Sequence, residues 1–238
     1  MPRTLAEELR SDIAAIQYYD SISVDLSGTF FEPLLSRLPL PSLTVVGHSQ
    51  GSPGTAAGVL YRLARHAVRS GRSTIVTTGR EPIHLVRATC LLGHRQVAEQ
   101  ARRRPPDEGP DLDTAAMLGN VAKGRLHVNG IGDDLPAGIS SALRAGPVDM
   151  WLIDDVPSVT EALTQRQGRS MPPLSVEPTA LRRLSRERMC AVVVVVDWRL
   201  TDAWLWERAA DEVITVERDG DARPTLRSGS HEVAIPED

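Results

Sequence analysis

The chain has 238 residues and a net charge of −4 at pH 7; 41% of its residues are hydrophobic and 24% are charged. This composition is that of a globular protein and excludes a fibrous or disordered chain. The negative charge argues against a protein that coats nucleic acid with its whole surface, but it does not exclude a local basic patch. The first ten residues are too polar for a signal peptide, and no apolar run reaches the roughly 20 residues that span a bilayer. We therefore expect a cytoplasmic protein.

The first part of the chain alternates between predicted helices and strands. A capping box at Thr4–Glu7 begins a helix that runs to about Tyr19, and a linker-like stretch with several prolines follows up to Pro41. The next elements are, in order, an apolar strand at 43–47, a glycine-rich loop, a helix to about 69, a strand at 73–78 and a helix that includes 85–92.

The second part continues this alternation after a charged, proline-rich loop at 102–113. Its elements are, in order, a short helix from 114, a strand at 126–129, a helix at about 137–144, a strand at 150–154, a loop at 164–178, a helix at about 179–188, a strand at 190–196, a helix near 202–210, a strand at 212–217 and a terminal hairpin.

The central strands are continuous apolar runs, of which CAVVVVV at 190–196 is the strongest. Such runs predict an α/β fold with a mainly parallel sheet and helices on both faces. We assign residues 1–22 to an N-terminal helix and linker, and residues 23–238 to one domain. Cys90 and Cys190 lie in apolar surroundings, so we expect buried free thiols rather than a disulfide or a metal pair.

A glycine-rich loop joins the strand at 43–47 to the helix after it. Backbone N–H groups and a helix N-terminus form a cradle for phosphate in this arrangement. Gly47, Gly51, Gly54 and Thr55 resemble the phosphate-loop pattern G-x-x-x-x-G-K-[ST], but no register places a lysine there, and Lys123 is the only lysine of the chain. With one extra residue allowed, Gly54 stands at the lysine position and Thr55 at that of the magnesium-binding hydroxyl. The alternative is an ordinary glycine-rich turn.

The same segment contains a competing motif. GHSQG at 47–51 matches G-x-S-x-G, the nucleophile elbow of α/β-hydrolases. This alternative makes Ser49 the nucleophile, with Asp154 or Asp197 as the acid and His231 as the base. Against it, at most one predicted strand precedes the motif, no oxyanion-donating loop lies upstream, and His231 lies in a polar segment.

Five segments resemble, in order and spacing, the RecA-type motor domain of DnaB-family replicative helicases, from about Val24 onward. The sequence before that family's phosphate loop is similar to SGTFFEPLLSRLPLPSLTVVG, and its second strand and helix are similar to RSGRSTIVTTGREPIHLVRATCLLGHRQV. Its Walker B strand is similar to VDMWLIDDV, which puts Asp154 at the magnesium-associated position. The later segments that match are LRRLSRERMCAVVVVVD and ERAADEVITVERDGD. The resemblance implies a RecA-like P-loop fold, with ATP and magnesium as ligands.

The chain departs from this family at positions that carry catalysis. The loop lysine is absent, Gly79 aligns with the glutamate that activates water, with Glu81 two residues on, and Asp197 replaces the sensor glutamine. Arg227 matches the arginine of a trans-acting basic finger, without its companion lysine. The resemblance implies nucleotide binding by Gly47, Gly51, Gly54, Thr55, Asp154 and Arg227, and magnesium binding by Thr55 and Asp154.

These departures predict a pseudo-ATPase. Each lost pre-organised group costs on the order of 100- to 1,000-fold in rate, so hydrolysis should lie near background. We expect a domain that binds a protein partner, its own kind or DNA, and that holds ATP and magnesium weakly at most. The alternatives are the serine hydrolase and an unusual DNA-associated ATPase. Trp204 and Trp206 point to different faces of a predicted helix, so we expect one in a partner surface and the other in the core.

Overall fold

The structure is a computed structural model that describes residues 23–48, 53–79, 83–92, 119–130, 146–154, 177–199, 202–218 and 223–236, and the single residues 141, 144, 156 and 159. The predicted N-terminal helix and the predicted loop at 102–113 lie outside the described residues. No helix in the described ranges is long and apolar enough to cross a membrane.

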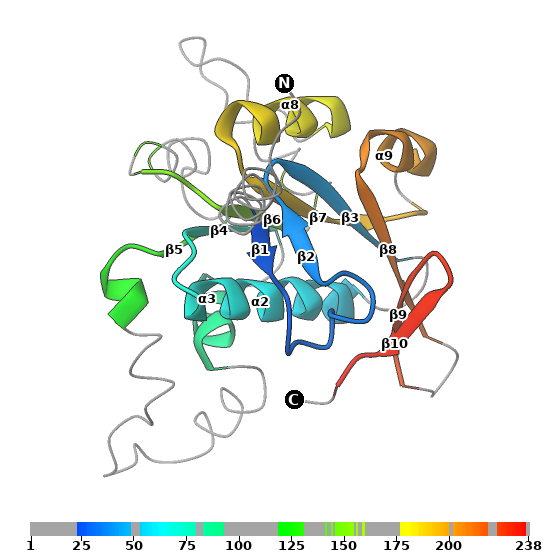
Figure 1. The fold of residues 1–238 in the computed structure, drawn as a ribbon, viewed down its shortest axis with the longest axis horizontal. Coiled ribbons are helices and arrows are strands. Elements are labelled where there is room, and N and C mark those ends of the chain that lie inside the picture. The colour runs from blue at the N-terminus through cyan, green and yellow to red at the C-terminus, as the bar shows by residue number, and fades with distance from the viewer. Residues whose placement is uncertain are drawn as a thin grey trace, which may run out of the picture.

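An eight-stranded sheet lies at the centre of the molecule, in the order β10-β9-β8-β3-β7-β6-β4-β5 (Figure 1). The six strands from β8 to β5 run parallel, and β9 and β10 add an antiparallel hairpin at one edge. Their bounds are β3 (Ser42–His48), β4 (Thr74–Thr78), β5 (Leu126–Gly130), β6 (Met150–Ile153), β7 (Ala191–Asp197), β8 (Glu212–Glu217), β9 (Thr225–Ser228) and β10 (His231–Ala234). The predicted mainly parallel sheet and terminal hairpin are confirmed.

Helices cover both faces of this sheet. Figure 1 shows α2 (Pro53–Arg69) and α3 (Ile83–Leu92) on one face, with α8 (Pro178–Arg188) and α9 (Ala203–Ala209) on the other. Alternate valines of β7 belong to two separate hydrophobic clusters, one on each face. This two-sided burial explains why β7 reads as an unbroken apolar run.

Helix α2 carries the residues that follow the glycine-rich loop. It forms because small and aliphatic side chains recur with helical spacing and are buried on one face, among them Ala56, Leu60, Leu63 and Ala67. It ends at a left-handed glycine: Gly71 has φ +75°, its N–H bonds the Val68 carbonyl, and the Arg72 N–H bonds the Ala67 carbonyl.

Residues 23–39 form a small hairpin where the sequence predicted a linker. Strands β1 (Ser23–Asp25) and β2 (Arg37–Pro39) pair antiparallel, and Leu26, Phe31 and Leu38 are buried in the cluster that also holds α2. The linker prediction was wrong because three-residue strands are too short to show a periodic pattern.

Candidate functional site

The order of the strands creates a topological switch point between β3 and β7. The chain leaves β3 through α2 toward β4 on one side of the sheet, and it leaves β7 through α9 toward β8 on the other side. The two strands end together, because His48 pairs with Asp197 in the parallel ladder. Open α/β sheets bind ligands at the carboxyl ends of strands at such a point.

The first turn of α2 lies beside this switch point. Pro53 begins the helix and the first turn contains no acidic residue, so its free N–H groups and dipole favour an anion. Gly54 is exposed, and a Cβ built on it would meet nothing within 4 Å, whereas Thr55 is half-buried. Of the predicted loop residues, Ser49 and Gly51 lie outside the described residues.

Gly47 makes a close contact that the sequence did not reveal. A Cβ at this position would lie 2.0 Å from atoms of the Trp198 ring, so only glycine lets the indole pack on the end of β3. The backbone N–H of Trp198 also donates to the His48 carbonyl at 3.0 Å. The residue at the start of the predicted loop is therefore a packing glycine as well.

Asp154 follows β6 and is completely buried. The Tyr61 hydroxyl of α2 donates to its Oδ2 at 2.5 Å, and the Gly79 N–H donates to its Oδ1 at 2.8 Å. Burial and the negative charge of Asp154 raise the pKa of Tyr61 well above its ordinary value, so the phenol stays protonated and keeps donating. Both oxygens of the predicted magnesium ligand are thus bound by donors of the protein.

Gly79 stands where the related helicases carry a water-activating glutamate. It offers no carboxylate, and its backbone N–H is used to hold Asp154. Glu81 lies outside the described residues. Both cysteines are buried free thiols, as predicted, and burial raises the pKa of each to about 12, which keeps them in the unreactive thiol form.

Asp197 and Arg199 form a tight pair at the carboxyl end of β7. Arg199 donates from Nη2 at 2.7 Å, from Nε at 3.0 Å and from its backbone N–H at 2.9 Å. The side-chain hydrogen bonds of Arg199 lower the pKa of Asp197 to about 2. Arg199 was not predicted as a site residue; the only signal available was its position two residues after Asp197.

Arg227 and His231 lie in the edge hairpin, away from the switch point. Arg227 is paired with Glu217 and Glu232 at 3.2 and 3.0 Å. His231 is exposed on β10, three strands from β3, whereas Asp154 follows β6 on the other side of β3. At about 4.8 Å per strand step, the predicted acid and base of the hydrolase lie roughly 24 Å apart. The sheet order therefore does not bring this triad together, and placing Asp197 in it leaves four strand steps to His231.

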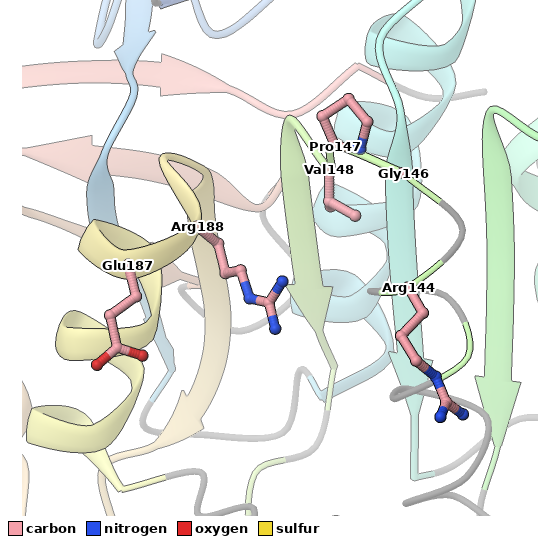
Figure 2. A pocket seen from close by; sticks show the side chains of 6 residues that line it. All are labelled: Arg144, Gly146, Pro147, Val148, Glu187 and Arg188. Atoms are coloured by element: carbon pink, nitrogen blue, oxygen red, sulfur yellow. The ribbon is translucent and has the colours of Figure 1, made fainter.

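The only lysine lies at the opposite edge of the sheet. Lys123 precedes the amino end of β5, so it is remote from the loop after β3. A hollow of about 370 Å³ also lies at the amino edge, and Figure 2 shows Arg188 reaching it from the end of α8 and Arg144 from the segment before β6. This edge does not carry the switch point. Among the described residues, no group of three His, Cys, Asp or Glu side chains could hold a metal ion.

Comparisons with known proteins agree with this geometry. No protein-family model and no curated protein matches the chain. Solved structures do match: a DnaB-like ATPase domain has a TM-score of 0.56 at 11% identity and covers 97% of this chain and 92% of that one. The flagellar accessory protein FlaH from Methanocaldococcus jannaschii has a TM-score of 0.54 at 12% identity, covering 87% and 86%. The KaiC-like protein PH0186 from Pyrococcus horikoshii OT3 has a TM-score of 0.51 at 13% identity, covering 90% and 92%.

These identities are low, so the likeness establishes the fold. The chain has a RecA-like α/β P-loop fold, with a mainly parallel sheet and helices on both faces, as the sequence predicted.

Proposed function

We propose that this chain is a non-hydrolysing RecA-like domain that acts by binding a protein partner. The observation that carries the proposal is the state of Asp154, which is buried and accepts hydrogen bonds on both oxygens from Tyr61 and Gly79. A magnesium ligand of a nucleotide site needs a carboxylate oxygen that faces the nucleotide. Asp154 instead ties α2 and the end of β4 to the end of β6.

The residues present fit a phosphate group better than they fit magnesium. The open first turn of α2, with Gly54 exposed and Thr55 beside it, supports weak phosphate binding. Magnesium binding by Thr55 and Asp154 does not fit the arrangement, because breaking the Tyr61 bond would leave a buried hydroxyl without this acceptor. We therefore assign no catalytic step to a metal at this site.

The charge at the switch point supports the same proposal. The lysine that neutralises the β- and γ-phosphates in P-loop enzymes is missing, and Lys123 lies at the far edge of the sheet. Arg199 is the cation at the carboxyl end of β7, and Asp197 already compensates its charge at 2.7 Å. Gly79 supplies no carboxylate to orient water.

A binding role also agrees with the surface of α9. Trp204 is 59% exposed and Leu205 is 39% exposed, whereas Trp206 is 4% exposed. One tryptophan on the surface and one in the core is the predicted arrangement. Two adjacent large apolar side chains on a surface helix favour a protein partner over a solvated face.

Calorimetry and phosphate release test the proposal together. We expect ATP with magnesium to bind no tighter than tens of micromolar, roughly the loss expected when one charge-assisted contact to phosphate is removed. We expect phosphate release at background. Submicromolar ATP binding with turnover would contradict the proposal, and turnover that appears only with single-stranded DNA would point to the DNA-associated ATPase. Labelling by a fluorophosphonate that disappears in Ser49→Ala would favour the hydrolase.

A further inference from the structure

A hollow of about 340 Å³ lies along the second half of α2. Arg62, Arg65, His66 and Arg69 line it, and their spacing of three, four and seven residues places them on one face of the helix. The loop after β1, including Phe30, and Pro236 near the end of the chain form the other walls. A polar helix face is usually open to solvent, but here two other segments cover its sides.

The basic side chains are held in place by the walls. Arg62 donates from Nη2 to the Pro236 carbonyl at 2.7 Å, and its guanidinium lies over the Phe30 ring, 5.4 Å from the centroid. His66 donates from Nε2 to the Asp25 carbonyl at 2.6 Å. The cations are therefore positioned before any ligand arrives, which lowers the entropy cost of binding.

The positive charge of the hollow is not balanced by its own lining. No acidic residue lines it among the described residues. Arg65 Nε is buried and has no hydrogen-bond partner in the described part of the chain. The acids of the neighbouring loop are engaged elsewhere: Asp25 accepts from Ser27, and Glu32 accepts from the Gly28 N–H at 2.8 Å. A buried N–H donor without an acceptor is costly, so an anionic ligand would relieve it.

We propose that this hollow binds a small ligand through a phosphate or diphosphate group. Guanidinium groups match phosphate oxygens in bidentate geometry, and three of them spaced along two turns suit a group with at least two negative charges. The volume lies at the small end of the range for ligand pockets, about 300–1,000 Å³. The phosphate group is common to a nucleotide and to free diphosphate, and the experiment below separates these sources.

A nucleic-acid backbone fits the hollow less well. A polynucleotide needs a continuous basic groove, whereas Pro236 and the loop after β1 close this hollow at its sides. The hollow is also distinct from the loop after β3. Arg69 follows Gly54 by fifteen residues, so about 22 Å of helix separates the two positions. The inference therefore does not depend on the proposed function.

Calorimetry on the full chain without magnesium tests the inference, with pyrophosphate and ADP as separate probes. We expect one saturable site that Arg65→Gln and Arg69→Gln each weaken by at least about tenfold. Arg183→Gln is the matched control, because Arg183 is an exposed helix arginine paired only with Glu187 at 3.7 Å among the printed contacts of α8. Arg69 is exposed, so its variant will fold even if Arg65→Gln does not.

The two probes identify the source of the phosphate. Tighter binding of ADP assigns a nucleotide, and equal or tighter binding of pyrophosphate assigns the phosphate group alone. The inference is overturned if neither probe saturates, if both pocket variants bind like the parent, or if Gly54→Asp abolishes binding while the pocket variants retain it. A single-stranded oligonucleotide that binds more tightly than ADP, with the same loss in the pocket variants, would replace the small ligand by a nucleic-acid backbone.

Discussion

Asp154 and Asp197 end up at the same edge of the sheet, and both are held by donors from the protein itself. Asp154 is buried and accepts from a phenol and a backbone N–H, whereas Asp197 is paired with the largely exposed guanidinium of Arg199. The first carboxylate fastens α2 to the sheet, and the second orders the turn after β7. In each case the group that a nucleotide site would need has a structural partner.

The first prediction concerns the Tyr61 hydroxyl. Tyr61→Phe removes one of the two printed donors to a buried carboxylate, so the free energy of unfolding should fall by about 1.5–3 kcal/mol. Urea denaturation measures this change. The control is the double variant with Asp154→Asn, in which the two losses should not add, because both remove the same hydrogen bond. A change below about 0.5 kcal/mol would show that the bond contributes little.

The second prediction concerns the pH dependence that Asp197 contributes. Its pKa is about 2 in the folded protein against 3.8 as the ordinary value, so its stabilisation is present above pH 3.8 and is lost as the pH falls toward 2. Because Arg199 is 57% exposed, we expect a contribution of only about 1 kcal/mol. Asp197→Asn should therefore be less stable than the parent at pH 5 and equally stable near pH 2. Asp202→Asn, at an exposed helix start without a side-chain cap bond, is the control and should show no such convergence.

At the scale of elements, the parallel core could be predicted because its strands are long apolar runs. β7 and β3 each have seven buried residues in succession, and that pattern has few explanations other than a strand covered on both sides. The helix after the loop could be predicted from its apolar spacing. The residues of the candidate site could be placed at strand ends for the same reason.

The contacts between elements could not be predicted. Tyr61 and Asp154 are 93 residues apart, and Tyr61 reads in the sequence as one more apolar position of α2. Trp198 reads as an ordinary residue after a strand, although it packs on Gly47. The β1–β2 hairpin, which forms part of the basic hollow, has strands too short for a pattern. Long-range pairing of this kind is set by the topology, which the local sequence does not encode.

The third prediction tests the first turn of α2 as a phosphate site. Gly54→Lys adds an ammonium where a Cβ meets nothing within 4 Å, so ATP binding should strengthen by about 1–3 kcal/mol. Gly119→Lys is the control, because it adds the same charge at another open glycine outside this site. Calorimetry should show tighter binding for the first variant only.

Turnover should not follow from this variant alone. Gly79 provides no water-orienting carboxylate, and a missing group of that kind costs about 1,000-fold, or roughly 4 kcal/mol of barrier. Phosphate release should rise above background only when Gly79→Glu is added to Gly54→Lys. Turnover by the parent chain or by Gly54→Lys alone would mean that another acid acts, and Glu81 would be tested first.

At the scale of the whole molecule, the chain places different chemistry at different edges of one sheet. The carboxyl edge holds the switch point and two engaged aspartates, and the amino edge holds Lys123 and the arginines of Figure 2. The basic hollow lies on the outer face of α2, and the exposed apolar pair lies on α9. A net charge of −4 thus conceals a local positive site, which is why composition alone could not exclude anion binding.

The last prediction uses the two tryptophans of α9 as a matched pair. Trp204 is 59% exposed, so Trp204→Ser should change the free energy of unfolding by less than about 0.5 kcal/mol. If the exposed face binds a second copy, as the binding role proposes, the same variant should weaken self-association at least about tenfold in sedimentation velocity, because exposed tryptophans are frequent interface hot spots. Trp206 is 4% exposed, so Trp206→Ser should instead cost about 3–5 kcal/mol of stability. A parent chain that remains monomeric at its highest soluble concentration would exclude self-association. Equal stability losses in the two variants would show that Trp204 belongs to the core and not to a partner surface.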